Sequence, residues 1–186
     1  MEIKNVSFSY GDEPVLIDFS LSLPKGRRVA VMGESGRGKT TLMRLILGLV
    51  KPDSGTIERE PDERPSAVFQ EDRLLPWYTA LKNVELTAVD EGESQRLLAD
   101  MELGDCMGKL PKELSGGQQR RAAIARALAY KGCPLLLDEP FKGLDADMRE
   151  RIADRILARA DGAAILLITH DEKEAELLKC GEIIRL

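Results

Sequence analysis

The chain contains two glycine-rich segments with the composition of phosphate-binding loops, and the first has a strict spacing. Residues 33–40 read GESGRGKT and fit the pattern GxxxxGK[ST]. Glycines let backbone N–H groups curve around phosphate oxygens without a Cβ clash. The pattern predicts that the Lys39 ammonium reaches the β- and γ-phosphates of a nucleotide and that the Thr40 hydroxyl binds Mg²⁺. The candidate phosphate-binding residues of this segment are Gly33, Ser35, Gly36, Gly38, Lys39, Thr40 and Thr41.

An acidic pair follows a short apolar run further along the chain. Residues 135–137 are three leucines, and Asp138 and Glu139 come directly after them. A buried strand here delivers Asp138 at its carboxyl end, where open α/β sheets bind ligands. We expect Asp138 to hold Mg²⁺, directly or through water, and Glu139 to orient or deprotonate an attacking water. The alternative is that the pair only caps a strand, which the upstream glycine loop makes the weaker interpretation.

The second glycine segment, residues 114–118, reads LSGGQ. Ser115 followed three residues later by Gln118 is a capping-box pattern, and it predicts a helix running to about Tyr130. A helix amino terminus with two bare glycines, Gly116 and Gly117, is also a suitable cradle for an anion. A plain helix cap and an anion site are both compatible with this segment.

The elements that must position these residues begin with extended segments. Residues 3–8 and 15–23 alternate apolar and polar side chains, and the second segment is predicted to be a half-buried antiparallel strand. Its inward face is expected to carry Val15, Ile17, Phe19, Leu21 and Leu23. The apolar run 29–32 then enters the first glycine loop, and residues 39–47 read as a helix, which is the strand–loop–helix context that this loop needs. An accidental glycine loop has a chance on the order of one per cent before that context is considered.

The rest of the chain is helical in the middle and alternating at its end. Short helices are expected around residues 81–86 and 97–101, strands at 67–69, 135–137, 163–169 and 183–184, and helices around 148–157 and 172–178. Residues 48–55 and 59–65 read as turns and a surface loop. Strands that alternate with helices predict a parallel sheet. The predicted fold is α/β, a P-loop NTPase core of residues 1–72 and 131–186 with a small antiparallel β lobe, and an inserted helical lobe of residues 73–130.

Composition limits the class of protein. The 186 residues are 43% hydrophobic and 32% charged, as in a soluble globular domain, and the net charge of −5 argues against nucleic acid as the main partner. Cys106, Cys133 and Cys180 are widely spaced, which argues against a disulfide or metal site and favours a reduced cytosolic setting. No signal peptide is visible, and no apolar stretch reaches the ~20 residues of a membrane span. Work at a membrane would therefore require another chain.

With LSGGQ in place behind the GxxxxGK[ST] loop, the chain resembles the nucleotide-binding subunit of an ABC transporter. The resemblance covers nearly the whole chain and identifies residues 114–118 as the family's signature. In this family the signature closes over the γ-phosphate held by the P-loop of a partner chain. The resemblance therefore implies ATP and Mg²⁺ as cofactors, a second ATPase subunit as a partner, and ATP sites completed by Ser115, Gly116, Gly117 and Gln118 of that partner.

Four more residues match the family's elements in order. Tyr10 stands where an aromatic ring stacks on adenine, with chance packing near a turn as the alternative. Gln70 matches the glutamine that senses Mg²⁺ and links to the transmembrane subunit. Asp145 ends the segment GLD, whose aspartate crosses the dimer interface, and His170 matches the histidine that contacts the γ-phosphate. A lone histidine is more often structural, but this one follows an expected buried strand at the motif position.

Residues 69–77, FQEDRLLPW, look most like importers of the nitrate, sulfonate and taurine type. That resemblance implies a transmembrane permease and a substrate-binding protein as partners, no nucleic acid, and a location at the cytoplasmic face of the membrane. Trp77 with residues 74–75 is either an exposed patch for the permease or ordinary core packing. Three positions depart from the family's usual pattern, Arg37 in the P-loop and Lys142 with Gly143 before residues 144–145.

Two other functional classes remain open at this point. Soluble ABC ATPases of DNA repair or translation carry long insertions or paired ATPase units, and the stretch between Gln70 and Leu114 is too short for such an insertion. A regulatory module of the same fold would be expected to lose Glu139 or the signature, and both are present. ATP-driven transport is therefore the preferred hypothesis.

Overall fold

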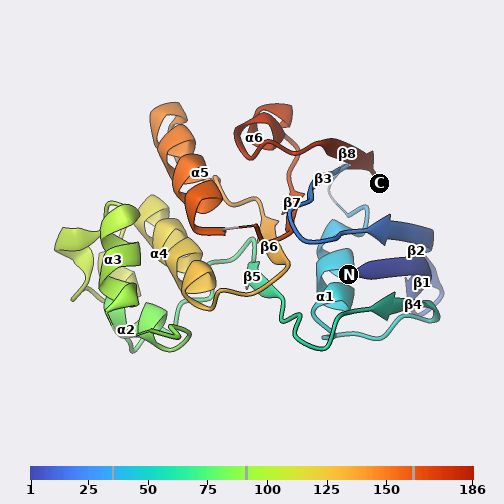
Figure 1. Ribbon diagram of the computed structural model, residues 1–186, viewed down its shortest axis with the longest axis horizontal. Coiled ribbons are helices and arrows are strands. Elements are labelled where there is room, and N and C mark those ends of the chain that lie inside the picture. The colour runs from blue at the N-terminus through green and yellow to red at the C-terminus, as the bar shows by residue number, and fades with distance from the viewer. Residues whose placement is uncertain (35, 91, 161) are drawn as a thin grey trace.

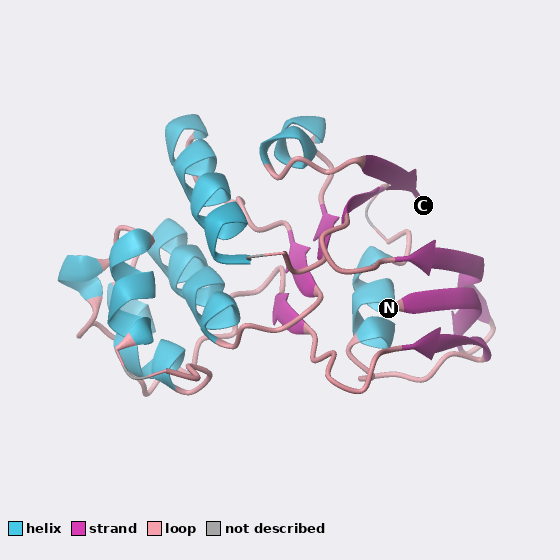
Figure 2. Ribbon diagram, in the orientation of Figure 1, coloured by secondary structure: helices cyan, strands magenta, loops and turns pink. Residues whose placement is uncertain are grey.

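A computed structural model describes residues 1–34, 36–90, 92–160 and 162–186. The described elements form an antiparallel sheet at one end of the molecule, a parallel sheet in the middle and a group of helices at the other end (Figures 1 and 2). The helical group consists of α2 (Ala80–Glu85), α3 (Glu93–Asp100) and α4 (Gly116–Ala129), with short 3-10 turns at Gly104–Cys106 and Pro111–Glu113. The predicted α/β class, with its antiparallel and helical additions, is confirmed.

The antiparallel sheet has the strand order β2-β1-β4, with bounds Glu13–Ser22, Glu2–Tyr10 and Ser54–Glu58. Strand β4 was not predicted, since its first two residues lie in the predicted turns of 48–55 and no element was predicted for residues 56–58. Ile57 is its one large apolar side chain, so the strand has no visible alternation. Its conformation comes from pairing with β1, where Ile57 lies opposite Ile3.

The predicted inward face of β2 is wrong at Ile17. Asp18 has a φ of 51°, and the pairing of β1 with β2 shifts register between Val6 and Phe8. A bulge of this kind adds a residue to one strand and reverses which side chains face the core. Leu16 is therefore 3% exposed and Ile17 is 75% exposed, while the positions after the bulge keep their predicted burial.

The second sheet is parallel throughout and has the order β5-β6-β7-β3-β8. The bounds are Ser66–Val68, Leu135–Asp138, Ile165–Ile168, Arg28–Met32 and Glu182–Arg185. Parallel strands end at the same edge, so the segments that follow β3, β5, β6 and β7 come together there. These segments carry the first glycine loop, Gln70, Glu139 and His170.

Each face of the parallel sheet is covered by its own hydrophobic core. Leu136 and Leu166 belong to a cluster with the apolar face of α1 (Lys39–Ile46) and the antiparallel sheet. Leu137 and Leu167 belong to a second cluster, formed with α4, α5 (Ala146–Ala160) and α6 (Glu172–Leu177). Alternate residues of one strand thus enter different cores, as expected for strands buried on both faces.

Several composition-level expectations concern the surface and the thiols. None of the helices in the described ranges is long and apolar enough to cross a membrane. The three cysteines are unpaired, and burial raises the pKa of the Cys180 thiol to about 11. Trp77 is 67% exposed, while Leu74 and Leu75 are half-buried. The tryptophan is therefore a surface residue, and Leu74 packs against the core of the helical group.

The bulge in β2 predicts that two neighbouring substitutions change the free energy of unfolding by very different amounts. Leu16→Ala should lower the free energy of unfolding by about 2–4 kcal/mol, because it leaves a cavity in the core. Ile17→Ala should change it by less than about 0.5 kcal/mol, because that side chain is in solvent. Urea denaturation of both variants measures the difference. Equal losses, or a larger loss for Ile17→Ala, would show that β2 has the register of simple alternation.

Candidate nucleotide site

The first glycine loop joins β3 to α1 and is pressed against the antiparallel sheet. Ser35 lies outside the described residues. Gly36 and Gly38 have φ values of 86° and 88°, in the left-handed region that glycine tolerates best. A Cβ atom on Gly38 would lie 2.8 Å from Val15 Cγ1 and 3.0 Å from the Val15 carbonyl oxygen. Strand β2 therefore leaves no room for a side chain at this turn of the loop.

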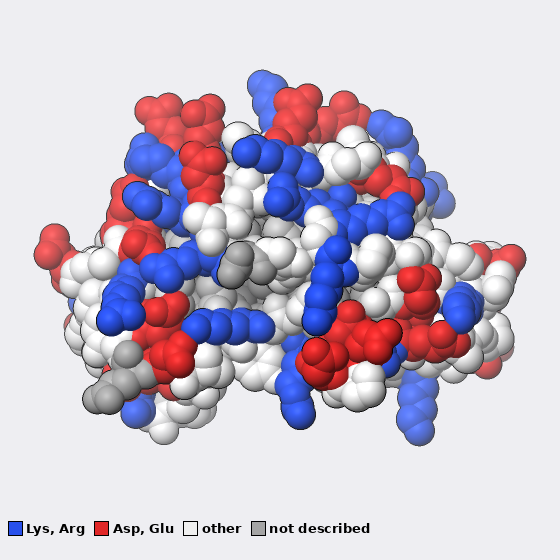
Figure 3. All heavy atoms as spheres, viewed as in Figure 1, with Lys and Arg blue, Asp and Glu red and all other residues white. Residues whose placement is uncertain are grey.

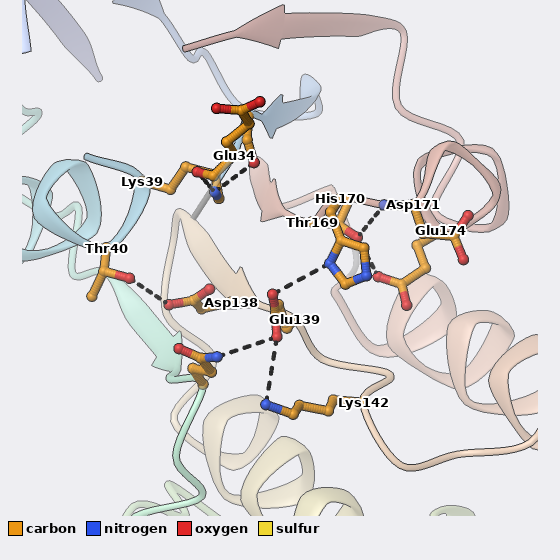
Figure 4. A network of polar contacts seen from close by, with 12 residues as sticks. Glu34, Lys39, Thr40, Asp138, Glu139, Lys142, Thr169, His170, Asp171 and Glu174 are labelled. Atoms are coloured by element: carbon orange, nitrogen blue, oxygen red, sulfur yellow. Dashed lines mark hydrogen bonds and ion pairs between the residues drawn. The ribbon is translucent and has the colours of Figure 1, made fainter. Parts of the chain in front are cut away.

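The Lys39 side chain curls back over the loop that precedes it. Its Nζ donates hydrogen bonds of 2.7 Å to the carbonyl oxygens of Gly33 and Glu34 (Figure 4). An ammonium with three donors and no acceptor can exchange such partners for the oxygens of a phosphate. The loop thus holds a cation ready at the amino terminus of α1, where the helix dipole also favours an anion.

Thr40 and Asp138 meet beside the loop and offer oxygen ligands. The Thr40 hydroxyl donates to Asp138 Oδ2 at 3.3 Å (Figure 4). Asp138 is 3% exposed, and burial raises the pKa of its carboxyl group. A carboxylate and a hydroxyl are the hard donors that Mg²⁺ prefers, and Mg²⁺ takes its other ligands from phosphates and water. The residues present therefore fit a phosphate-bound Mg²⁺ ion.

The Glu139 carboxylate lies where three polar side chains converge. Gln70 Nε2 donates to Glu139 Oε2 at 3.4 Å, and His170 Nδ1 lies 3.4 Å from Oε1. Lys142 Nζ lies 3.9 Å from Oε2 (Figure 4). Glu139 itself has a φ of 47°, an uncommon conformation for a residue with a side chain.

His170 is placed by a buried polar group just beyond β7. The Thr169 hydroxyl donates to Glu174 Oε2 at 2.6 Å and accepts from the Asp171 N–H at 3.1 Å. Arg149 Nη1 lies 3.6 Å from Glu174 Oε1, and burial raises the pKa of the Glu174 carboxyl group. The His170 side chain is 75% exposed, so it is not a histidine satisfied within the core. Its neighbours hold the backbone, while the ring contacts Glu139 and is otherwise open to solvent.

Tyr10 lies at the end of β1 beside α1 and does not line the pocket of the glycine loop. Its ring packs edge-on against Phe8 with centroids 4.9 Å apart, and Arg44 Nη1 donates to its hydroxyl at 3.1 Å. Hydrogen bonds from Thr41 and then Arg44 lower the pKa of the phenol. The ring is partly exposed, so one face is available to an aromatic base.

The LSGGQ segment forms the predicted capping box. Ser115 Oγ accepts from the Gln118 N–H at 3.2 Å, and Gln118 Oε1 accepts from the Ser115 N–H at 2.9 Å. A Cβ on Gly117 would lie 3.1 Å from Leu144 Cδ2, whereas one on Gly116 would meet nothing within 4 Å. Asp145 Oδ1 caps α5 by accepting from the Met148 N–H at 2.9 Å.

Most of the predicted site residues line one of two cavities, and Tyr10 and Gln118 line neither. The first has a volume of about 300 Å³ and is lined by Gly33, Gly36, Gly38, Lys39, Thr40, Thr41, Gln70, Asp138, Glu139 and His170. The second has a volume of about 660 Å³, and Ser115, Gly116, Gly117, Lys142, Asp145 and again Gln70 contribute to its wall. The signature therefore does not line the phosphate loop's pocket within one chain. Gln70 lies on both walls.

The fold and the first cavity define a P-loop nucleotide-binding protein, and comparisons with known proteins identify its family. Residues 16–142 match the ABC transporter family. Aliphatic sulfonates import ATP-binding protein SsuB 1 of Agrobacterium fabrum is 42% identical over 94% of this chain and 67% of its own length. SsuB 3 of Paraburkholderia xenovorans is 44% identical over 94% of this chain and 72% of its own length.

Solved structures agree with this assignment. The post-hydrolysis dimer of the ATP-binding cassette MJ0796, bound to ADP and Pi, superposes with a TM-score of 0.85 at 32% identity, covering 100% of this chain and 93% of that one. An ATP-binding subunit of an ABC transporter superposes with a TM-score of 0.88 at 28% identity, covering 100% and 85%. The chain belongs to the ABC transporter family, and it is an ATP-binding protein that hydrolyses ATP.

Contact with β2 predicts that Gly38 is required for nucleotide binding. Gly38→Ala should abolish ATP binding, because the added methyl group displaces either the loop or Val15. Gly26→Ala is the matched control, since Gly26 has a similar φ of 80° but open space around it. The control should lose about 1–2 kcal/mol of stability and keep its ATP affinity. Titration with a fluorescent ATP analogue compares the two, and equal affinities would contradict the role of the contact.

Proposed function

We propose that this chain is the ATP-hydrolysing subunit of an importer and that it works as a head-to-tail dimer with two composite ATP sites. The observation that carries the proposal is the separation of the two cavities. One holds the phosphate loop and the acidic pair, and the other holds the signature. A second chain facing the first supplies the missing wall of each site. The dimeric structures of the similar cassette MJ0796 support this arrangement.

Each residue of the composite site has an assigned task. The loop amides and Lys39 bind the β- and γ-phosphates, and Tyr10 stacks on the adenine. Thr40 and Asp138, with Gln70, hold Mg²⁺, which neutralises charge on the phosphates when it is bound. Glu139 orients the attacking water and takes its proton, while His170 contacts the γ-phosphate. Ser115, Gly116 and Gly117 of the facing chain, with Gln118 and Asp145, close the site.

The two functional regions correspond to two parts of the chain. We assign residues 1–72 and 131–186 to the ATP-binding core and residues 73–130 to the helical lobe that carries most of the signature. This division follows the sheet strands, which lie in the first part, and helices α2, α3 and α4, which lie in the second. ATP would draw the core of one chain against the helical lobe of the other.

The proposed partners are a transmembrane permease and a substrate-binding protein, with the chain at the cytoplasmic face of the membrane. The names of the relatives describe import of aliphatic sulfonates, which supports a small organic anion as cargo. Exposed Trp77 follows the Gln70 segment and offers a contact for the permease. Basic and acidic side chains are interspersed on the face drawn in Figure 3, which agrees with the net charge of −5 in disfavouring a nucleic acid partner.

Trapping the closed state tests the composite site. A Glu139→Gln variant should be a monomer alone and a dimer with ATP and Mg²⁺, because slowed hydrolysis preserves the bound γ-phosphate that joins two chains. Light scattering on a sizing column measures the mass. Lys39→Ala, which should not retain the nucleotide, is the control and should stay a monomer. A Glu139→Gln monomer with ATP demonstrably bound would overturn the self-closing dimer.

The two signature glycines predict different defects. Gly117→Ala should destabilise the monomer by roughly 1 kcal/mol, because its methyl group meets Leu144. Gly116→Ala should leave the monomer as stable or more stable, because alanine suits a first helical turn and meets open space. It should nonetheless weaken ATP-driven dimerisation in the Glu139→Gln background, since the methyl group occupies the cradle. Undiminished dimerisation of Gly116→Ala would exclude a role for this cradle.

A further inference from the structure

The backbone of Gln70 is held by side chains of the signature helix. Arg120 of α4 donates from Nη1 to the Phe69 carbonyl oxygen at 2.6 Å and from Nη2 to the Gln70 carbonyl oxygen. Arg120 is 4% exposed, so its guanidinium has little water to bind instead. A planar guanidinium that donates to two successive carbonyls fixes both the position and the direction of the peptide between them.

A second arginine of the same helix holds the next turn of this segment. Arg126 Nη2 donates to the Asp72 carbonyl oxygen at 2.9 Å, and Nη1 donates to the Arg73 carbonyl oxygen at 2.8 Å. Arg126 is half-buried, and this burial lowers the pKa of its guanidinium. We call residues 69–73 the clamped segment, because α4 binds its carbonyls at both ends.

An acidic side chain completes the clamp from within the segment. Asp72 Oδ1 lies 3.1 Å from Arg120 Nε, and burial raises the pKa of the Asp72 carboxyl group. This oxygen accepts no hydrogen bond from the residues that the structure describes, so the contact is an ion pair without that support. A buried ion pair of this kind is a poor source of stability, because desolvation offsets the attraction. What the ion pair supplies instead is a defined position for the segment.

The clamp joins two parts of the site that lie in different cavities. Gln70 Nε2 contacts the Glu139 carboxylate at 3.4 Å, and Ser115, at the amino terminus of α4, lies in the second cavity. Because Ser115 and Arg120 belong to the same amino-terminal half of the signature helix, a displacement of α4 as a rigid body would carry the backbone of Gln70 with Ser115.

We propose that Arg120, with Asp72 and Arg126, positions Gln70 against Glu139 and ties that position to the signature helix. The proposal rests on the function assigned above, in which Gln70 and Glu139 serve one ATP site and the signature of the same chain serves the other. Arg120 contacts neither Glu139 nor the phosphate loop in the hydrogen bonds described, and it acts through Gln70. The clamp thereby couples the position of the signature helix to the position of Gln70 beside Glu139, the carboxylate that activates water.

A double-mutant cycle tests whether Arg120 acts through Gln70. In the full chain, Arg120→Met should lower kcat roughly tenfold with little change in KM. The reason is that a small displacement of Gln70 from its position beside Glu139 slows the chemical step. Arg120→Lys, which keeps the charge but loses the fork, should recover part of the rate. In a Gln70→Ala background, Arg120→Met should cost less than about twofold more, because the group it positions is gone.

Controls separate a positioning defect from a loss of stability. Arg159→Met removes ion pairs to Asp100 and Glu93, and none of these three residues lines either site cavity, so the variant should lower stability and keep the parent kcat. If Arg120→Met does not fold, Asp72→Asn, which preserves shape, runs the same cycle. Additive losses in the cycle would overturn the clamp and leave the proposed function intact. A Gln70→Ala variant with full kcat would remove Gln70 from the proposed function and the clamp along with it.

Discussion

Burial of the parallel sheet on both faces is the constraint on which the site depends. Except for Asp138 at the carboxyl end of β6, strands β6 and β7 in the middle of the sheet are apolar, because charged side chains along them would carry a large desolvation cost. The carboxyl edge is where the chain leaves the core, and polar groups there reach solvent while their backbone stays anchored. Lys39, Glu139 and His170 come from three separate segments, yet they meet because β3, β6 and β7 share one direction.

Charge at this edge is concentrated in a few partly buried groups. Burial raises the carboxyl pKa values of Asp138 and Glu174, so the folded chain bears a cost for keeping either group ionised. A cation bound at Asp138 would relieve that cost, and at Glu174 the nearby Arg149 does so in part.

Sequence patterns predicted the parts of the molecule that local chemistry determines. Three such features can each be recognised within a few residues: the glycine loop, the capping box at Ser115 and the leucine strand before Asp138. The structure has all three. Strand β4 was missed because its pairing with β1, not its own alternation, makes it extended. Ile17 was misplaced because one residue with positive φ reverses the faces of a strand.

Long-range polar contacts explain the remaining gaps. Arg120 and the clamped segment are about 50 residues apart in the chain, and no spacing rule connects them. Lys142 stood out only as a departure from the family's usual residues, and its place three positions after Glu139 gave no measure of how near the two side chains would lie. The separation of the two cavities likewise depends on how the helical group sits beside the sheet.

The contact between β2 and Gly38 has a consequence for fragments of this protein. Every phosphate-binding residue comes after position 32, so a chain that began at β3 would retain the whole glycine loop. It would lose Val15 and Leu16, which pack against the turn of the loop at Gly38. A shortened chain of this kind would keep the motif in its sequence but lose the support that gives the loop its conformation. Strand β2, which lies outside the glycine motif, is therefore part of what encodes nucleotide binding.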